Sequence, residues 1–131
     1  MNLDPAVGGT MKSRSMRRVS KAIKFGLSGV IMVALGRGAA AGRLPRNLFA
    51  GIRLPSTLRS DEAWHAGHLA AASALTVSGV GPIAVATIVG ATRPGPRAQA
   101  VLFRIGSAWL LGWLGRATFL ASRAARAEDV S

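Results

Sequence analysis

Residues 60–68 hold most of the side chains that could carry out chemistry. Ser60, Asp61 and His68 are the residue types of a nucleophile, an acid and a base, and His65 and His68 could titrate near neutral pH or bind a metal. The stretch has neither a glycine-rich elbow nor oxyanion donors, so we expect no enzyme activity. Two imidazoles three positions apart offer a metal no third ligand, and phosphate loops and dinucleotide fingerprints are absent. We therefore expect no metal and no cofactor, and interpret His68 as a packed residue hydrogen-bonded to the preceding loop, with a titrating role as the alternative.

The preceding loop, residues 43–62, combines turn formers with polar side chains that make directed contacts. Ser60 can cap a helix, and Asp61 and Glu62 favour the positive end of its dipole, so a helix is expected to start here, with Trp64 and His68 on one face. We expect Arg53 to form a charge cluster with the two acids that locks the loop over this helix. The alternatives for Arg53 are contact with lipid phosphate alone or a partner site.

This order of residues resembles the signature of the SdpI-like bacterial membrane proteins, which reads N-x-aromatic-x-G-(I/V)-R-x-P-x-T, an acidic pair, and then W-x-x-x-H-R. The resemblance covers residues 45–68 closely and residues 25–90 more loosely. Leu69 stands where the final arginine is expected, and Leu54 where threonine is commoner. The matching positions, which are the candidates for partner binding, are Asn47, Phe49, Gly51, Arg53, Pro55, Thr57, Asp61, Glu62, Trp64 and His68. From the residues alone, Asn47 is expected to satisfy loop backbone groups, with recognition as its alternative.

The resemblance implies a multi-pass protein of the bacterial cytoplasmic membrane, of a class linked to immunity against a secreted antimicrobial peptide toxin. Membrane sequestration of a transcription regulator is a second role of the family. The mechanism we expect is binding, in which the loop offers a shaped cationic and aromatic surface to a membrane-active peptide. The rival hypothesis is a small structural subunit that packs its glycine- and alanine-rich helices against a larger membrane protein.

Composition agrees with a membrane setting. The chain has 131 residues, enough for one domain, and 17 Lys and Arg against 5 Asp and Glu give a net charge of +12, yet half of its residues are hydrophobic. The charges lie at the borders of apolar runs, whereas a nucleic-acid-binding domain places them on faces among polar residues, so we expect no specific nucleic-acid partner. The absence of cysteine excludes disulfides and thiolate metal sites.

Three apolar runs determine the predicted fold. Residues 69–92 are uncharged over 24 positions, enough for about 30 Å of hydrocarbon. The only charged residue in residues 25–42 is Arg37. Residues 98–122 contain two, Arg104 and Arg116. All three arginines lie towards the ends of their runs, where long side chains can extend to the headgroups. The sequence predicts an all-α integral membrane protein with three transmembrane helices, near 23–42, 67–91 and 98–121, and a structured loop between the first two. A helix lying along the membrane interface is the alternative for the third run.

The remaining segments complete the predicted organisation. Residues 1–20 are expected to form a disordered basic tail, residues 21–122 the membrane domain, and residues 123–131 a short polar tail. Met11 and Met16 offer later translation starts, and a cleaved signal peptide is the alternative for the first run. The positive-inside rule barely decides the orientation, because three crossings place nine Lys and Arg on the N-terminal side of the membrane and eight on the other. The full-length chain should therefore lean weakly towards a cytoplasmic N-terminus, and a chain starting at Met16 towards the reverse.

Small residues are expected to govern helix packing. Gly26, Gly29 and Gly36 are spaced as a small-residue face on the first helix. Gly106, Gly112 and Gly115 should likewise allow close approach on the third. Pro82 should kink the second helix, because it lacks the N–H that would bond to the Ser78 carbonyl.

Overall fold

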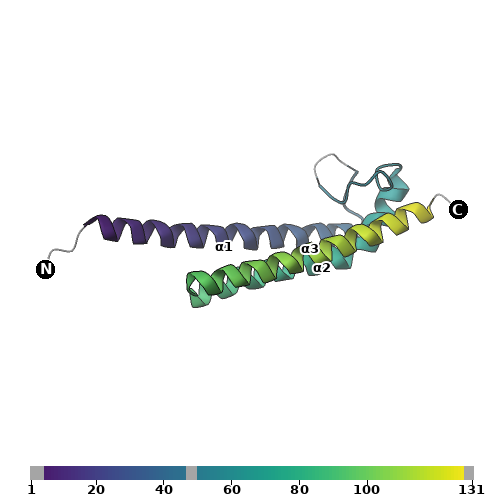
Figure 1. Cartoon of the computed structure of the whole chain (residues 1–131). Helices are drawn as coiled ribbons and strands as arrows, with labels where there is room; N and C mark the ends of the chain where they lie inside the picture. The colour runs from purple at the N-terminus through teal and green to yellow at the C-terminus, as the bar shows by residue number, and fades with distance from the viewer. Residues whose placement is uncertain (1–4, 47–49, 129–131) are drawn as a thin grey trace.

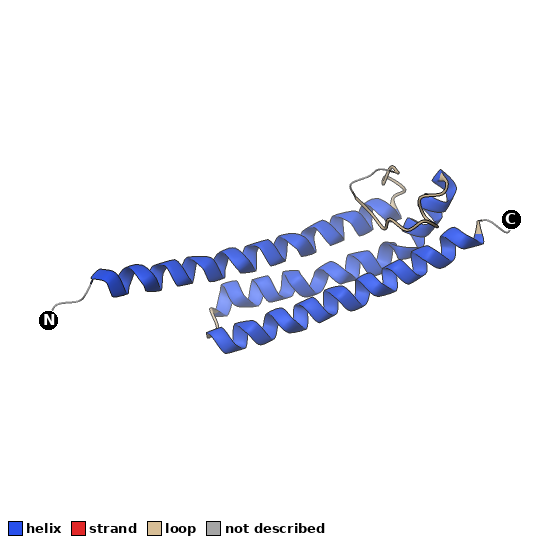
Figure 2. Ribbon diagram, turned by 45° about the horizontal axis from the view of Figure 1, so that its top comes forward, coloured by secondary structure: helices blue, strands red, loops and turns tan. Residues whose placement is uncertain are grey.

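The computed structural model describes residues 5–46 and 50–128 and consists of three α-helices, α1 (Pro5–Ala40), α2 (Asp61–Thr92) and α3 (Pro96–Ala127). They run alongside one another, and α2 packs against both of the others (Figure 1, Figure 2). The N-terminal half of α1 extends beyond the α2–α3 turn, while the loop before α2 lies at the opposite end of the bundle, near the C-terminus of α3 (Figure 1). The all-helical prediction is confirmed for the described residues.

Helix α1 begins much earlier than the apolar run that was expected to form it. Residues 1–20 were predicted to be disordered, whereas α1 already starts at Pro5 and continues for 36 residues, about 54 Å. The reason is that a helix nucleated in the apolar run extends cheaply into neighbouring Met, Lys, Arg and Ala residues, which are good helix formers.

Both ends of α2 follow from local sequence. The Ser60 hydroxyl accepts a hydrogen bond from the Ala63 amide at 3.0 Å, with Asp61 and Glu62 in the first turn, which confirms the predicted helix start. At the other end Arg93 takes a left-handed conformation with φ 46°, and its amide donates to the Val89 carbonyl. A Pro at the first position of α3 then starts the returning helix. Helix α2 continues through Pro82, which is buried.

Glycines bring the backbones of α1 and α2 together. A Cβ added to Gly29 or Gly79 would collide with the carbonyl oxygen of the other, and one added to Gly26 or Gly36 would also strike α2. The predicted glycine face of α1 is therefore confirmed. On α3 the prediction is confirmed for Gly106, which contacts α1 and α2, whereas Gly112 and Gly115 face open space and have no neighbour in the described residues.

Alanines form the contact between α2 and α3. Ala117, Ala121 and Ala125, spaced four apart, are fully buried, and the first two pack with Ala71 and Leu75 of α2. The Trp109 indole N–H adds a hydrogen bond from α3 to the Val77 carbonyl of α2 at 2.9 Å. Small residues at helix contacts and interhelical hydrogen bonds are typical of bundles in lipid.

Large apolar side chains point outwards. Leu27, Ile31, Ile105, Leu111 and Phe119 are all exposed, as expected for surfaces that face hydrocarbon. Ser13–Ala40 and Asp61–Thr92 are long and apolar enough to cross a membrane. Helix α3 does not meet the same criterion, because arginines interrupt its apolar run. The structure thus supports two of the three predicted spans.

Candidate functional site

The loop before α2 folds back over the first two turns of that helix. Trp64 and His68 lie on one face, as predicted, with ring centroids 4.0 Å apart and side chains almost wholly buried. The Trp64 indole N–H donates to the Leu44 carbonyl at 2.8 Å, so the beginning of the loop is fastened to the helix. Trp64 is therefore a buried anchor for the loop.

His68 connects the middle of the loop to α2. Its Nε2 accepts a hydrogen bond from the Ile52 amide at 2.8 Å, and its Nδ1 lies 2.8 Å from the Trp64 carbonyl oxygen. A carbonyl can only accept, so Nδ1 carries the proton and Nε2 is bare. The contacts define one neutral tautomer, and they agree with the interpretation of His68 as a packed residue hydrogen-bonded to the loop.

Thr57 closes the second half of the loop. Its fully buried hydroxyl donates to the Ile52 carbonyl at 2.7 Å and accepts from the Leu54 amide at 3.0 Å. Its methyl group packs on Gly67 of α2, where a Cβ would lie 3.0 Å from Thr57 and 3.1 Å from the Ala121 carbonyl of α3. The loop, α2 and α3 therefore meet at Gly67.

Gly51 is required where the loop crosses the two rings. Its φ is +108°, a conformation that side chains rarely adopt, and an added Cβ would lie 2.5 Å from the His68 Nε2 and 3.0 Å from the Trp64 ring. The neighbouring Ile52 packs against the alanine core between α2 and α3.

The ion pair at this site differs from the expected one. Asp61 pairs with Arg46, whose Nε lies 3.0 Å from Oδ1, and Arg46 also donates to the Leu58 carbonyl at 3.0 Å. The prediction that Arg53 pairs with the acids is wrong, because the closed loop turns Arg53 outwards and brings Arg46 to the start of α2. The two side chains are 41% and 69% exposed, so this pair contributes about 0–1 kcal/mol.

The ten signature residues thus divide into two described groups and one undescribed group. Thr57, Trp64 and His68 are buried and partly buried Gly51 packs on the last two, whereas Arg53, Pro55, Asp61 and Glu62 are exposed. Asn47 and Phe49 lie outside the described residues. Sequence reasoning missed the Leu44 carbonyl and Arg46: a backbone acceptor leaves no side-chain signal, and only the folded loop selects one arginine among several.

The polar side chains at this site are engaged in structural hydrogen bonds. The Ser60 hydroxyl is engaged in capping α2, and His68 uses both ring nitrogens in structural hydrogen bonds. In the described part of the chain, no three His, Cys, Asp or Glu side chains come close enough to hold a metal ion.

Comparison with protein families gives one match. The model of the SdpI/YfhL protein family matches residues 43–121, more than half of the chain, from the start of the loop through α2 to Ala121 of α3. The chain therefore belongs to the SdpI/YfhL family of membrane proteins, which confirms the resemblance of the signature residues. Comparison with curated proteins and with solved structures finds no match.

Proposed function

We propose that this protein acts by binding at the bacterial cytoplasmic membrane, in immunity against a membrane-active peptide toxin or in associated signalling. The observation that carries the proposal is the division of the signature. Its interior residues hold the loop in one shape, while Arg53 and Pro55 are exposed. Arg53 makes no ion pair within the described residues, so it is free to contact a partner.

The proposed setting is a multi-pass protein in which α3 also crosses the bilayer. Val101, Ile105, Leu111 and Phe119 expose large apolar side chains along α3, and Arg104 and Arg116 can extend towards the headgroups. Crossing by all three helices places the loop and the C-terminus on the same side. A helix lying along the interface places them on opposite sides.

Cysteine labelling tests this topology, because the chain contains no cysteine of its own. We expect a membrane-impermeant thiol reagent to reach Ser56→Cys and Ser131→Cys from the same side. Labelling from opposite sides would contradict three crossings.

The chain should also stay with membranes in alkaline carbonate. Val85→Arg, in the middle of α2, should make membrane insertion less favourable by about 2.5–3.5 kcal/mol.

The binding role is tested by challenging cells with a panel of membrane-permeabilising bacterial peptides, with and without expression of the chain. We expect protection against at least one peptide, and loss of that protection in Arg53→Gln at an unchanged melting temperature in detergent. Arg123→Gln, an exposed arginine near the end of α3, is the matched control and should protect fully. Full protection by Arg53→Gln would contradict recognition by the exposed part of the signature.

A structural role in a larger membrane assembly is the second candidate. The observation that favours it is the open space at Gly112 and Gly115, where another helix could approach closely. Purification in mild detergent separates the two hypotheses. A larger membrane protein that co-purifies with the native chain and is lost in Gly112→Leu, without any peptide protection, would favour assembly.

A further inference from the structure

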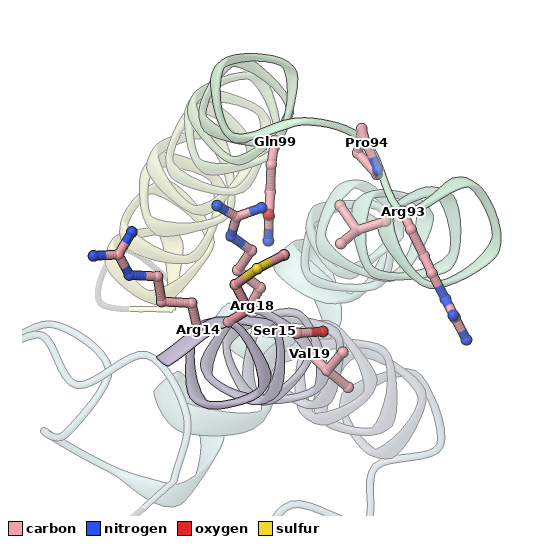
Figure 3. A pocket seen from close by; sticks show the side chains of 9 residues that line it. Arg14, Ser15, Arg18, Val19, Arg93, Pro94 and Gln99 are labelled. Atoms are coloured by element: carbon pink, nitrogen blue, oxygen red, sulfur yellow. The ribbon is translucent and has the colours of Figure 1, made fainter. Parts of the chain in front are cut away.

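A basic cavity lies at the end of the bundle opposite the loop. It has a volume of about 530 Å³ and is formed by the N-terminal half of α1, the end of α2 and the start of α3. Arg18 of α1 and Gln99 of α3 point towards each other across it, while Arg14 and Arg93 flank it on two sides (Figure 3). Helix α1 thus supplies two of the three arginines and the end of α2 the third, and the Arg18 guanidinium meets the Gln99 amide while those of Arg14 and Arg93 point to opposite sides (Figure 3).

The charge of this end is uncompensated within the described residues. The described acids are Asp61 and Glu62 at the start of α2 and Glu128 after α3, all at the far end of the bundle. Because none of the described acids is near, the arginines around the cavity favour an anionic occupant. Guanidinium groups bind phosphate oxygens through paired hydrogen bonds, which makes phosphate the matching chemistry.

Gln99 contributes a hydrogen-bonding group to the cavity. The residue is only 6% exposed and its side chain is directed into the cavity, while no described side-chain nitrogen or oxygen is buried without a partner. The amide atoms of Gln99 therefore remain accessible from the cavity, where a bound oxygen anion would accept the N–H groups. The N-terminus of α3, which begins one turn before Gln99, adds the positive end of a helix dipole.

The surroundings indicate that the phosphate belongs to a lipid. Val89 and Arg93 line the cavity where the uncharged run of α2 ends, at the level expected for headgroups. An open depression of about 420 Å³ along α1 shares Ser15 and Val19 with the cavity and continues past Ile23. A free phosphate has no use for this apolar path, whereas an acyl chain would follow it.

We propose that this cavity binds the phosphate of an anionic phospholipid between Arg18 and Gln99, with Arg14 and Arg93 at its edges and an acyl chain along α1. The site is separate from the loop, so this proposal does not depend on which partner the loop binds. Its function is to fix the position of the extended α1 relative to the α2–α3 turn at the membrane surface.

The test uses the full-length chain, stripped of lipid in an uncharged detergent and titrated with phosphatidylglycerol, phosphatidylcholine or inorganic phosphate under native mass spectrometry. Arg18→Gln should bind phosphatidylglycerol about ten-fold or more weakly, because it loses charge-assisted hydrogen bonds. Arg17→Gln is the matched control: it removes the same charge from an exposed neighbour that does not line the cavity. Loss of one general surface charge weakens binding by about five-fold at most.

Three results would overturn the proposal. Equal binding of phosphatidylglycerol and phosphatidylcholine would exclude an anion site. Equal weakening of phosphatidylglycerol binding by Arg17→Gln and Arg18→Gln would mean that the basic surface attracts anionic lipid without a defined site. Inorganic phosphate bound as tightly as phosphatidylglycerol would assign the site to the free ion. If Arg18→Gln lowers the melting temperature without lipid, Arg93→Gln is used in its place. Arg93 is exposed, and a glutamine there keeps the backbone amide that bonds to the Val89 carbonyl.

Discussion

Replacing Gly51 by alanine tests whether the loop is held in one shape by the rings beneath it. The matched control is Gly42→Ala in the same loop region. Both glycines have positive φ, +108° and +65°, so both substitutions strain the backbone. Only Gly51 has neighbours within 4 Å, because the His68 Nε2 and the Trp64 ring lie against it, whereas nothing lies near Gly42.

The expected magnitudes differ accordingly. Gly42→Ala should cost about 1 kcal/mol of unfolding free energy, the usual penalty for alanine in a left-handed conformation. Gly51→Ala should cost about 1–3 kcal/mol for its backbone. Its methyl group also forces the loop away from His68 and breaks the Ile52 hydrogen bond, which adds about 1–3 kcal/mol for a buried acceptor left unpaired. We therefore expect a difference of at least about 1 kcal/mol between the two variants.

Equilibrium unfolding in mixed detergent micelles gives the two free energies, and hydrogen exchange of the Trp64 indole N–H locates the effect. In the native protein that N–H is bonded to the Leu44 carbonyl and should exchange slowly. It should exchange faster in Gly51→Ala and remain slow in Gly42→Ala. Equal destabilisation by both, with the Trp64 N–H protected in each, would refute the argument that the rings define the loop.

Three further outcomes follow from the same contacts. Thr57→Val should destabilise the chain by about 2 kcal/mol or more, since it leaves two loop backbone groups unpaired. The control Thr118→Val loses only a hydrogen bond to its own helix and should cost under about 0.5 kcal/mol. Equal costs would contradict a special role for Thr57. Arg46→Gln should change unfolding by no more than about 1 kcal/mol, because its ion pair is exposed; a larger loss would mean that the pair holds the loop. In ¹⁵N spectra at neutral pH, His68 should show a bare Nε2 and a protonated Nδ1, with the exposed His65 as internal comparison, and a protonated Nε2 would overturn the assigned hydrogen bonds.

Much of the fold could be predicted because it follows from short-range rules. The cap at Ser60 and the shared face of Trp64 and His68 depend only on helix geometry, and the glycine face of α1 follows from residue spacing. The early start of α1 was missed for a complementary reason. Residues 5–20 lack an apolar pattern of their own, and their helix is an extension of one formed further along the chain.

The loop's partners could not be predicted, because they depend on three-dimensional closure. Arg46 and Arg53 are equally plausible partners for Asp61 in sequence, and only the turn over the rings selects Arg46. Similarly, Gly106 and Gly112 look alike in sequence, but one faces α1 and α2 while the other faces outwards. Residue type gives the ability to make a contact, whereas the neighbour is decided by which face the bundle buries.

The packing of four signature residues within the closed loop changes what a match to the signature means. Gly51, Thr57, Trp64 and His68 contact one another or the same loop segment, and each would disturb the loop if replaced. Matching these positions therefore indicates a shared loop conformation, because interior side chains cannot contact a partner while the loop is closed. In the proposed binding role, discrimination among partners would come from exposed side chains on that loop, of which Arg53 is the signature's own example. Proteins that share the buried residues can thus present the same shape while differing in what they bind.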